Sequence, residues 1–182
     1  MEFIVSALFT SIVAAVATYW FNECSAKKRL KEKKIGILRA ILTEVNALRG
    51  LIVARKRDFI IPYKSDILNY NFMYLPISYN YFTVYESRSA ELGIIDNNEL
   101  IDRVIRTYIE TKGLFENIKD LADCSRQYTS YIISDSYKTM AVQFIEAHHS
   151  YCMFILNQQA PMVENLLAIL ADELEKELSR IS

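Results

Sequence analysis

Residues 37–52, ILRAILTEVNALRGLI, place apolar side chains three and four positions apart, which is the spacing of one helix face. No proline occurs from residue 3 to residue 61, so the helix can extend in both directions from this stretch. Gly36 and Gly50 each weaken a helix by up to ~1 kcal/mol relative to alanine but do not end it. We therefore expect one long helix that continues to about Arg57. Its apolar stripe comprises Leu30, Ile37, Leu38, Ile41, Val45, Leu48 and Ile52.

Upstream of this stripe, the run FIVSALFTSIVAAVATYWF, from Phe3 to Phe21, contains no charged residue. As a helix it spans about 29 Å, close to the ~30 Å hydrocarbon core of a bilayer. Tyr19 and Trp20 lie at one end, where amphipathic rings favour the headgroup level. A cleaved signal peptide would carry basic residues before the run and small residues after it, and a buried core helix is the other alternative. We predict an uncleaved transmembrane anchor at residues 1–22.

A basic segment follows the predicted anchor directly. Residues 27–57 contain 11 basic and 2 acidic residues, whereas residues 58–182 contain 10 basic and 18 acidic residues. The net charge of −1 is thus a cancellation between a block of +9 and a body of −8. Basic residues stay on the cytoplasmic side, so we expect a single pass of the bacterial inner membrane, N-terminus out, with the bulk of the chain cytoplasmic. The residues that set this topology or contact lipid are Lys27, Lys28, Arg29, Lys31, Lys33 and Lys34.

The remaining sequence predicts an all-α fold. Residues 23–57 form the basic juxtamembrane helix, residues 58–79 an irregular connector rich in tyrosine and proline, and residues 80–182 a helical bundle. Helices are expected from about 80 to 92, 96 to 123, 135 to 159 and 162 to 181, with Pro161 separating the last two. The anchor thus continues into a cytoplasmic antiparallel bundle of about four to five helices.

Few residues in the bundle suggest metal chemistry. Glu146 and His149 have the Glu-x-x-His spacing of di-iron carboxylate bundles, but that architecture needs the motif on two helices. His148 and Cys152 lie one helical turn apart and could supply half of a zinc site. With no second set of ligands, we predict no metal and treat these four residues as weak candidates. We expect no cofactor.

Enzymatic chemistry is disfavoured. The glycines stand alone, so no glycine-rich loop can hold a phosphate, and no nucleophile motif is present. Glu44, Glu86, Glu91 and Glu110 are interpreted as solvated or salt-bridged carboxylates. We therefore predict a protein that is not an enzyme.

Small residues in the predicted anchor indicate a helix–helix interface. Ala7, Ser11 and Ala15 recur at four-residue spacing, which allows close approach of two spans. An anchor also concentrates the bundle in two dimensions, so weak self-association becomes effective. We expect the membrane, and a second copy or another protein, as partners. Nucleic acid is expected only indirectly, through such a partner.

The order of these parts resembles small single-pass membrane-anchored helical proteins of bacteria and their mobile elements, including antiphage effectors. The resembling features are the uncharged run, the lysine block, the stripe of residues 37–52 and the segment VYESRSAELGIID at residues 84–96. The resemblance implies a role in membrane-associated signalling or defence, such as a membrane-perturbing effector. Two alternatives are a membrane-tethered metal-dependent enzyme using Glu146 and His149, and a lipid- or nucleic-acid-binding adaptor using the basic helix.

Overall fold

The computed structural model describes residues 2–58, 79–132 and 138–181, with side chains at 13–54, 81–124 and 143–181 except residue 145. All regular structure in these ranges is helical, which confirms the all-α prediction. The predicted connector lies, from residue 59 to residue 78, outside the described residues. In chain order the elements are α1 (Glu2–Asp58), η2 (Tyr79–Phe82), α2 (Thr83–Arg88), η3 (Ser89–Ile94), α3 (Asn98–Ile132), α4 (Lys138–Phe154), η5 (Ile155–Gln159) and α5 (Ala160–Ile181).

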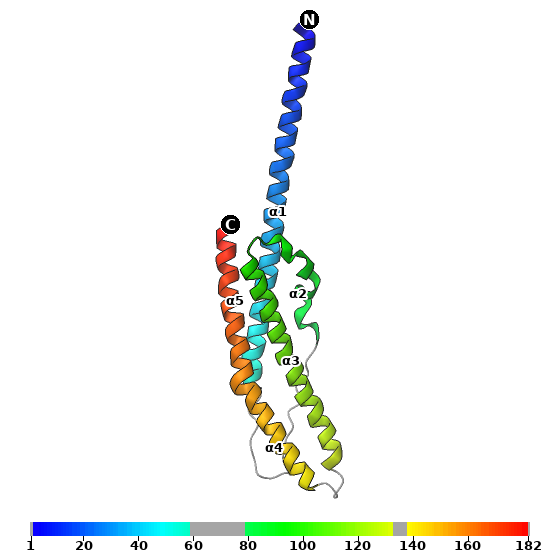
Figure 1. The fold of residues 1–182 in the computed structure, drawn as a ribbon, viewed down its shortest axis with the longest axis vertical. Coiled ribbons are helices and arrows are strands. Elements are labelled where there is room, and N and C mark those ends of the chain that lie inside the picture. The colour runs from blue at the N-terminus through cyan, green and yellow to red at the C-terminus, as the bar shows by residue number, and fades with distance from the viewer. Residues whose placement is uncertain (1, 59–78, 133–137, 182) are drawn as a thin grey trace.

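Helix α1 is one unbroken helix that is much longer than the bundle (Figure 1). It passes through Gly36 and Gly50, as predicted, because a lone glycine costs less than the tertiary packing on either side of it gains. Its first part stands apart from the other helices, and its second part packs along α5. The predicted anchor and the predicted juxtamembrane helix are therefore a single rod.

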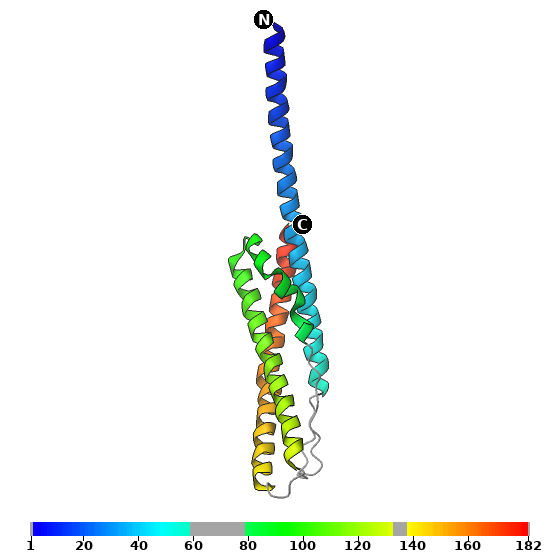
Figure 2. The ribbon, with the colours of Figure 1, turned by 90° about the vertical axis from the view of Figure 1, so that its right-hand side faces the viewer.

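The chain does not form the purely antiparallel bundle that the sequence predicts. Helices α1 and α3 run in the same direction, and α4 and α5 return in the opposite direction (Figures 1 and 2). The reason is the segment at residues 79–97, which we call the strap. The strap climbs beside α1 toward the level where α1 leaves the bundle, so α3 starts at that end and descends again.

Helix α3 begins where the sequence predicts and ends later. The side-chain oxygen of Asn97 accepts a hydrogen bond from the backbone N–H of Leu100 at 3.1 Å, so Asn97 caps this helix. The sequence predicts an end near residue 123, but α3 continues through the polar stretch at residues 124–131 to Ile132. Serine, threonine and tyrosine lower helix propensity only slightly, and the stretch contains neither glycine nor proline.

Pro161 does not separate two helices. The chain stays helical from α4 into α5 through the π-helical turn η5, and Ala160, just before Pro161, has helical φ and ψ of −64° and −43°. Proline lacks an N–H and its ring collides with the carbonyl four residues earlier in a regular α-helix. The wider π-turn accommodates the ring, so the rod continues.

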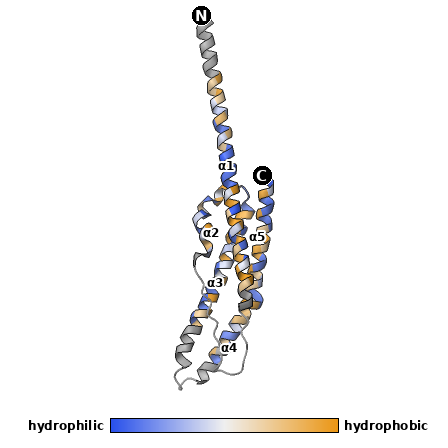
Figure 3. Cartoon of the chain, turned by 180° about the vertical axis from the view of Figure 1, so that it is seen from behind, coloured by the Kyte–Doolittle hydropathy of each residue, from blue (hydrophilic) through white to orange (hydrophobic). Residues whose placement is uncertain are grey.

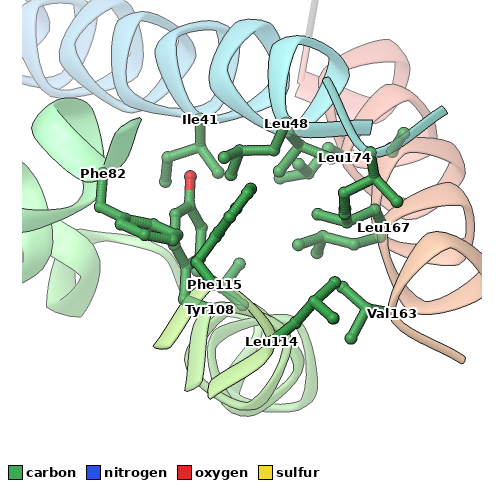
Figure 4. Close-up of a cluster of buried hydrophobic side chains, with 14 of the residues drawn as sticks. Ile41, Leu48, Phe82, Tyr108, Leu114, Phe115, Val163, Leu167 and Leu174 are labelled. Atoms are coloured by element: carbon green, nitrogen blue, oxygen red, sulfur yellow. The ribbon is translucent and has the colours of Figure 1, made fainter. Parts of the chain in front are cut away.

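The core lies between α1, α3 and α5, and Figure 4 shows its side chains from these three helices and from the strap. The predicted stripe of α1 is buried there except for Leu30, which is exposed because it lies beyond the bundle. The apolar face of α5 is buried from Val163 to Leu174, and Leu178 and Ile181 are partly buried. The largest fully buried side chains are Ile37, Leu38, Ile41, Leu48, Ile95, Leu114, Ile155, Leu167, Leu170 and Leu174.

Candidate functional site

The part of α1 beyond the bundle carries large apolar side chains that nothing in the described chain covers. Val13, Val16, Tyr19, Trp20 and Phe21 are exposed, the last three at 70–71%. Figure 3 shows orange residues in this part of α1 and blue residues where it joins the bundle. A row of this size is rare on a helix that remains in water, so an external partner or phase is expected to cover it.

The predicted anchor is helical, but no helix in the described part of the chain has an apolar stretch long enough to cross a membrane. The side chains of residues 1–12 lie outside the described residues, and these include Phe3, Ala7 and Ser11. Ala15, the third residue of the predicted interface between spans, is exposed on α1.

The structure divides the predicted lipid-contacting cations into two groups. Lys27 pairs with Glu23 at 2.8 Å, and Lys28 lies 4.0 Å from Glu32, both within the exposed part of α1. Arg29 and Lys31 are also exposed there. These four residues lie on the exposed part of α1, next to the predicted anchor, and their role in topology or lipid contact stays a prediction.

Lys33 and Lys34 belong to the bundle instead. The Lys33 ammonium lies 3.1 Å from the Glu91 carboxylate, and the Lys34 ammonium donates to Asp96 at 2.6 Å. The hydrogen bond from Lys34 lowers the pKa of Asp96, and the one from Lys33 lowers the pKa of Glu91. The Lys34 side chain is also largely buried. Both lysines hold the strap on α1, a role that the sequence did not indicate. Their part in topology or lipid contact stays a prediction.

A polar cluster surrounds Glu44, which the sequence analysis interprets as a solvated or salt-bridged carboxylate. Glu44 is buried on α1. Its Oε1 accepts the backbone N–H of Val84 at 2.7 Å, and its Oε2 accepts the backbone N–H of Tyr85 at 2.9 Å and the hydroxyl of Tyr108 at 2.6 Å. The N-cap residue of α2 is Phe82, whose side chain makes no capping hydrogen bond. Glu44 therefore performs that task from another helix.

Aromatic rings close this cluster. Tyr85 of the strap stacks on Tyr108 of α3 with ring centroids 4.1 Å apart. Phe82 meets Tyr108 and Phe115 edge to face at 6.1 and 5.8 Å. Burial, and then the hydrogen bond to Glu44, raises the pKa of Tyr108 far above its usual value, so its hydroxyl remains a donor. The strap thus joins α1 to α3 through one carboxylate and a row of rings.

A signal for Glu44 was present in the sequence. It lies three residues after Ile41 and four before Leu48, within the apolar stripe rather than beside it. A carboxylate at such a position is buried if the stripe is buried, and then it needs donors. The periodicity could not show that the donors come from a segment forty residues away.

The metal candidates are only partly brought together. His148 and Cys152 are buried, with the sulfur 3.7 Å from Nδ1 of the ring, whereas Glu146 is exposed and His149 is half-buried. Burial raises the pKa of the Cys152 thiol to about 12, which disfavours the thiolate that zinc needs. Within the described ranges, no three histidine, cysteine or acidic residues gather around one point. The pair is best understood as packing beneath α3.

The buried imidazole of His148 makes stability depend on pH. Burial lowers its pKa below the ordinary 6.5, against the opposing effect of a hydrogen bond with the backbone of Leu121. The unfolded chain therefore binds the proton more readily. The neutral His148 side chain contributes its full share to the free energy of unfolding above about pH 6.5. This share is lost as the pH falls below that value, by at most about 1.4 kcal/mol per pH unit. Thermal unfolding of the His148→Gln variant is expected to depend less on pH between about pH 8 and about pH 5.

The adjacent histidine provides the control for this measurement. His149→Gln changes the same residue type one position along the helix. It removes only the smallest of the effects on the pKa of His148, so it should keep most of the pH dependence of the unmodified chain. If His148→Gln and the unmodified chain lose melting temperature in parallel below about pH 6.5, the buried imidazole is not the titrating group.

Comparisons of the chain with protein-family models, with curated proteins and with solved structures found no match. The functional argument therefore comes from the two features described above, which are the exposed apolar part of α1 and the strap held over Glu44.

Proposed function

We propose that this chain is a non-enzymatic, membrane-anchored helical protein that acts through self-association or a protein partner, in the manner of a membrane-perturbing effector. One observation carries the proposal. Helix α1 leaves the bundle as a lone helix, and its apolar side chains between Val13 and Phe21 pack against nothing in the described chain. A bilayer is the partner of matching chemistry, because the uncharged run from Phe3 to Phe21 is about 29 Å long as a helix.

The charge order supports one orientation. The basic residues from Lys27 onward directly follow the apolar run, and the positive-inside rule assigns them to the cytoplasmic face. The bundle would then lie on the same side, beneath the inner membrane of a bacterium. Arg29 and Lys31, on the exposed part of α1, are positioned for anionic headgroups.

Continuity of α1 supports a mechanism. The same rod contributes the proposed span and one wall of the bundle core, through Ile37, Ile41 and Leu48. Because α1 is one unbroken helix from the proposed span into the bundle, a change in how the bundles associate would reorient the spans. Small residues at positions 7, 11 and 15 would permit two spans to approach closely.

The test is fractionation of the full chain after expression in a bacterium. We expect it to sediment with membranes and to resist extraction by salt and by alkali. Changing Val13 and Val16 together to aspartate should move it to the supernatant, because each charge near the centre of a span costs about 3 kcal/mol, roughly a hundredfold in partition.

Ile109→Asp is the matched control, since Ile109 is as exposed as Val16 but lies on α3. This variant should remain with the membranes. Sedimentation of the double variant at the level of the unmodified chain would contradict the proposal. Release of the unmodified chain by salt alone would indicate surface binding through the basic residues instead.

A further inference from the structure

A groove runs along one side of α1, between the uncharged run and the bundle. Its volume is about 490 Å³, and its lining includes Phe21, Asn22, Ser25, Arg29 and Lys33. Its polar residues lie three or four positions apart, so they share one face of the helix. From the first of them to the last, this face is about 17 Å long at 1.5 Å per residue. We call it the α1 groove.

The charge of the α1 groove differs from that of the rest of this stretch. Of the described residues that line it, two are basic, two are neutral hydrogen-bonding residues and none is acidic. The acidic residues of the stretch lie with other cations, since Lys27 pairs with Glu23 at 2.8 Å and Lys28 lies 4.0 Å from Glu32. The groove therefore keeps its positive charge.

Arg29 is the cation of the groove that is available to a ligand. It is exposed, and it has no ion-pair partner in the described part of the chain. Side chains of an α-helix lean toward its N-terminus, so the Arg29 guanidinium extends toward Ser25 and Asn22. A guanidinium binds phosphate through two parallel N–H donors, and the serine hydroxyl and asparagine amide provide donors for the same group.

The two ends of the groove differ in polarity. At the bundle end, Lys33 and Arg88 share the carboxylate of Glu91 at 3.1 and 3.2 Å, so two positive charges face one negative charge. At the other end lies Phe21, the last residue of the uncharged run. A ligand that matches the groove along its length thus has an anionic head and an apolar tail.

We propose that the α1 groove binds one anionic phospholipid, with its phosphate held by Arg29, Ser25 and Asn22. This inference rests on the proposed function, which places Phe21 at the edge of the hydrocarbon core. The headgroup layer beyond that edge is about 5–8 Å deep. Arg29 lies eight positions after Phe21, about 12 Å along the helix, and its side chain leans back toward the layer. The proposal assigns lipid selection to one face of α1 rather than to all of its cations.

The test measures lipid binding to the full chain, purified in detergent, by native mass spectrometry. The probe is phosphatidylglycerol, and the comparison is phosphatidylcholine, whose phosphate is balanced by a positive choline. We expect the first phosphatidylglycerol to bind at roughly tenfold lower concentration than phosphatidylcholine, since hydrogen bonds to charged groups are the strong ones. Arg29→Gln should remove most of this preference. Its circular dichroism should match that of the unmodified chain, because Arg29 is exposed.

Lys27→Gln is the matched control. It removes the same charge two positions earlier on the helix, but Lys27 pairs with Glu23 and does not line the groove. This variant should keep the preference for phosphatidylglycerol within about twofold, because exposed ion pairs contribute little. An equal loss of preference in Arg29→Gln and Lys27→Gln would show that diffuse charge attracts the lipid, which overturns the groove as a site.

Two further outcomes overturn the proposal. One is equal binding of the two lipids to the unmodified chain. The other is displacement of phosphatidylglycerol by inorganic phosphate at the same concentration, which would make the groove a site for a soluble anion. Membrane fractionation reports on the anchor separately, so a chain that sediments with membranes but shows no lipid preference contradicts the groove alone.

Discussion

Replacing Glu44 with alanine is expected to lower the free energy of unfolding by about 3 kcal/mol, because three donors lose a buried carboxylate at once. These donors are the backbone N–H groups of Val84 and Tyr85 and the hydroxyl of Tyr108. In the variant each of them loses the carboxylate oxygen that accepts its hydrogen bond. Urea denaturation of the full chain in detergent, followed by circular dichroism, measures the change. The strap should detach first, since Glu44 accepts the backbone N–H groups at the start of α2.

Two comparisons make this result specific. Tyr108→Phe removes one donor and leaves the carboxylate with both backbone partners, so we expect a smaller loss of about 1 kcal/mol. Glu116→Ala removes an exposed carboxylate on α3 and should change stability by less than about 0.5 kcal/mol. If Glu44→Ala were no more destabilising than Glu116→Ala, Glu44 would not hold the strap.

Leu174→Ala is expected to destabilise the bundle by about 2–5 kcal/mol. Leu174 is fully buried on α5, where Figure 4 shows it beside Leu48 of α1. Truncation leaves a cavity between the two helices that pack most extensively, and the rigid rod of α1 cannot collapse into it without losing other contacts. The same denaturation experiment measures the loss.

Ile169→Ala is the matched variant on the same helix. Ile169 is 36% exposed, so its truncation removes less buried surface and should cost clearly less than Leu174→Ala. Equal losses of stability for the two variants would mean that α5 does not pack on α1 through the face that carries Leu174. Membrane fractionation should be unchanged in both, because neither residue lies in the exposed part of α1.

The local spacing of apolar residues was sufficient to predict the long helices and their buried faces. The stripe at residues 37–52 is buried as predicted, and the α5 stripe from Val163 to Leu174 is buried too. Helix α3 begins at Asn98, close to the predicted start at about residue 96, and Asn97 caps it. These features depend on neighbours three or four residues away, which one sequence displays directly.

Features that depend on distant partners were predicted poorly. Glu44 was interpreted as a solvated or salt-bridged carboxylate, and Lys33 and Lys34 were assigned to topology or lipid contact, but the structure joins all three residues to the strap. What lies opposite these residues in space decides their contacts, and the helical spacing carries no record of that. Pro161 was expected to separate two helices, and a local π-turn accommodates it instead.

The amino-acid pattern is enough to show that the chain is all-helical, where the apolar faces of α1, α3 and α5 lie, and how charge is distributed from the uncharged run to the acidic body. The direction of α3, the division of the lysines and the burial of Glu44 follow from how the helices pack against one another. A helix needs only its own residues to be recognised, because its hydrogen bonds close within four positions. A buried carboxylate and its donors are joined across the fold, so their meeting is known only when the helices have packed.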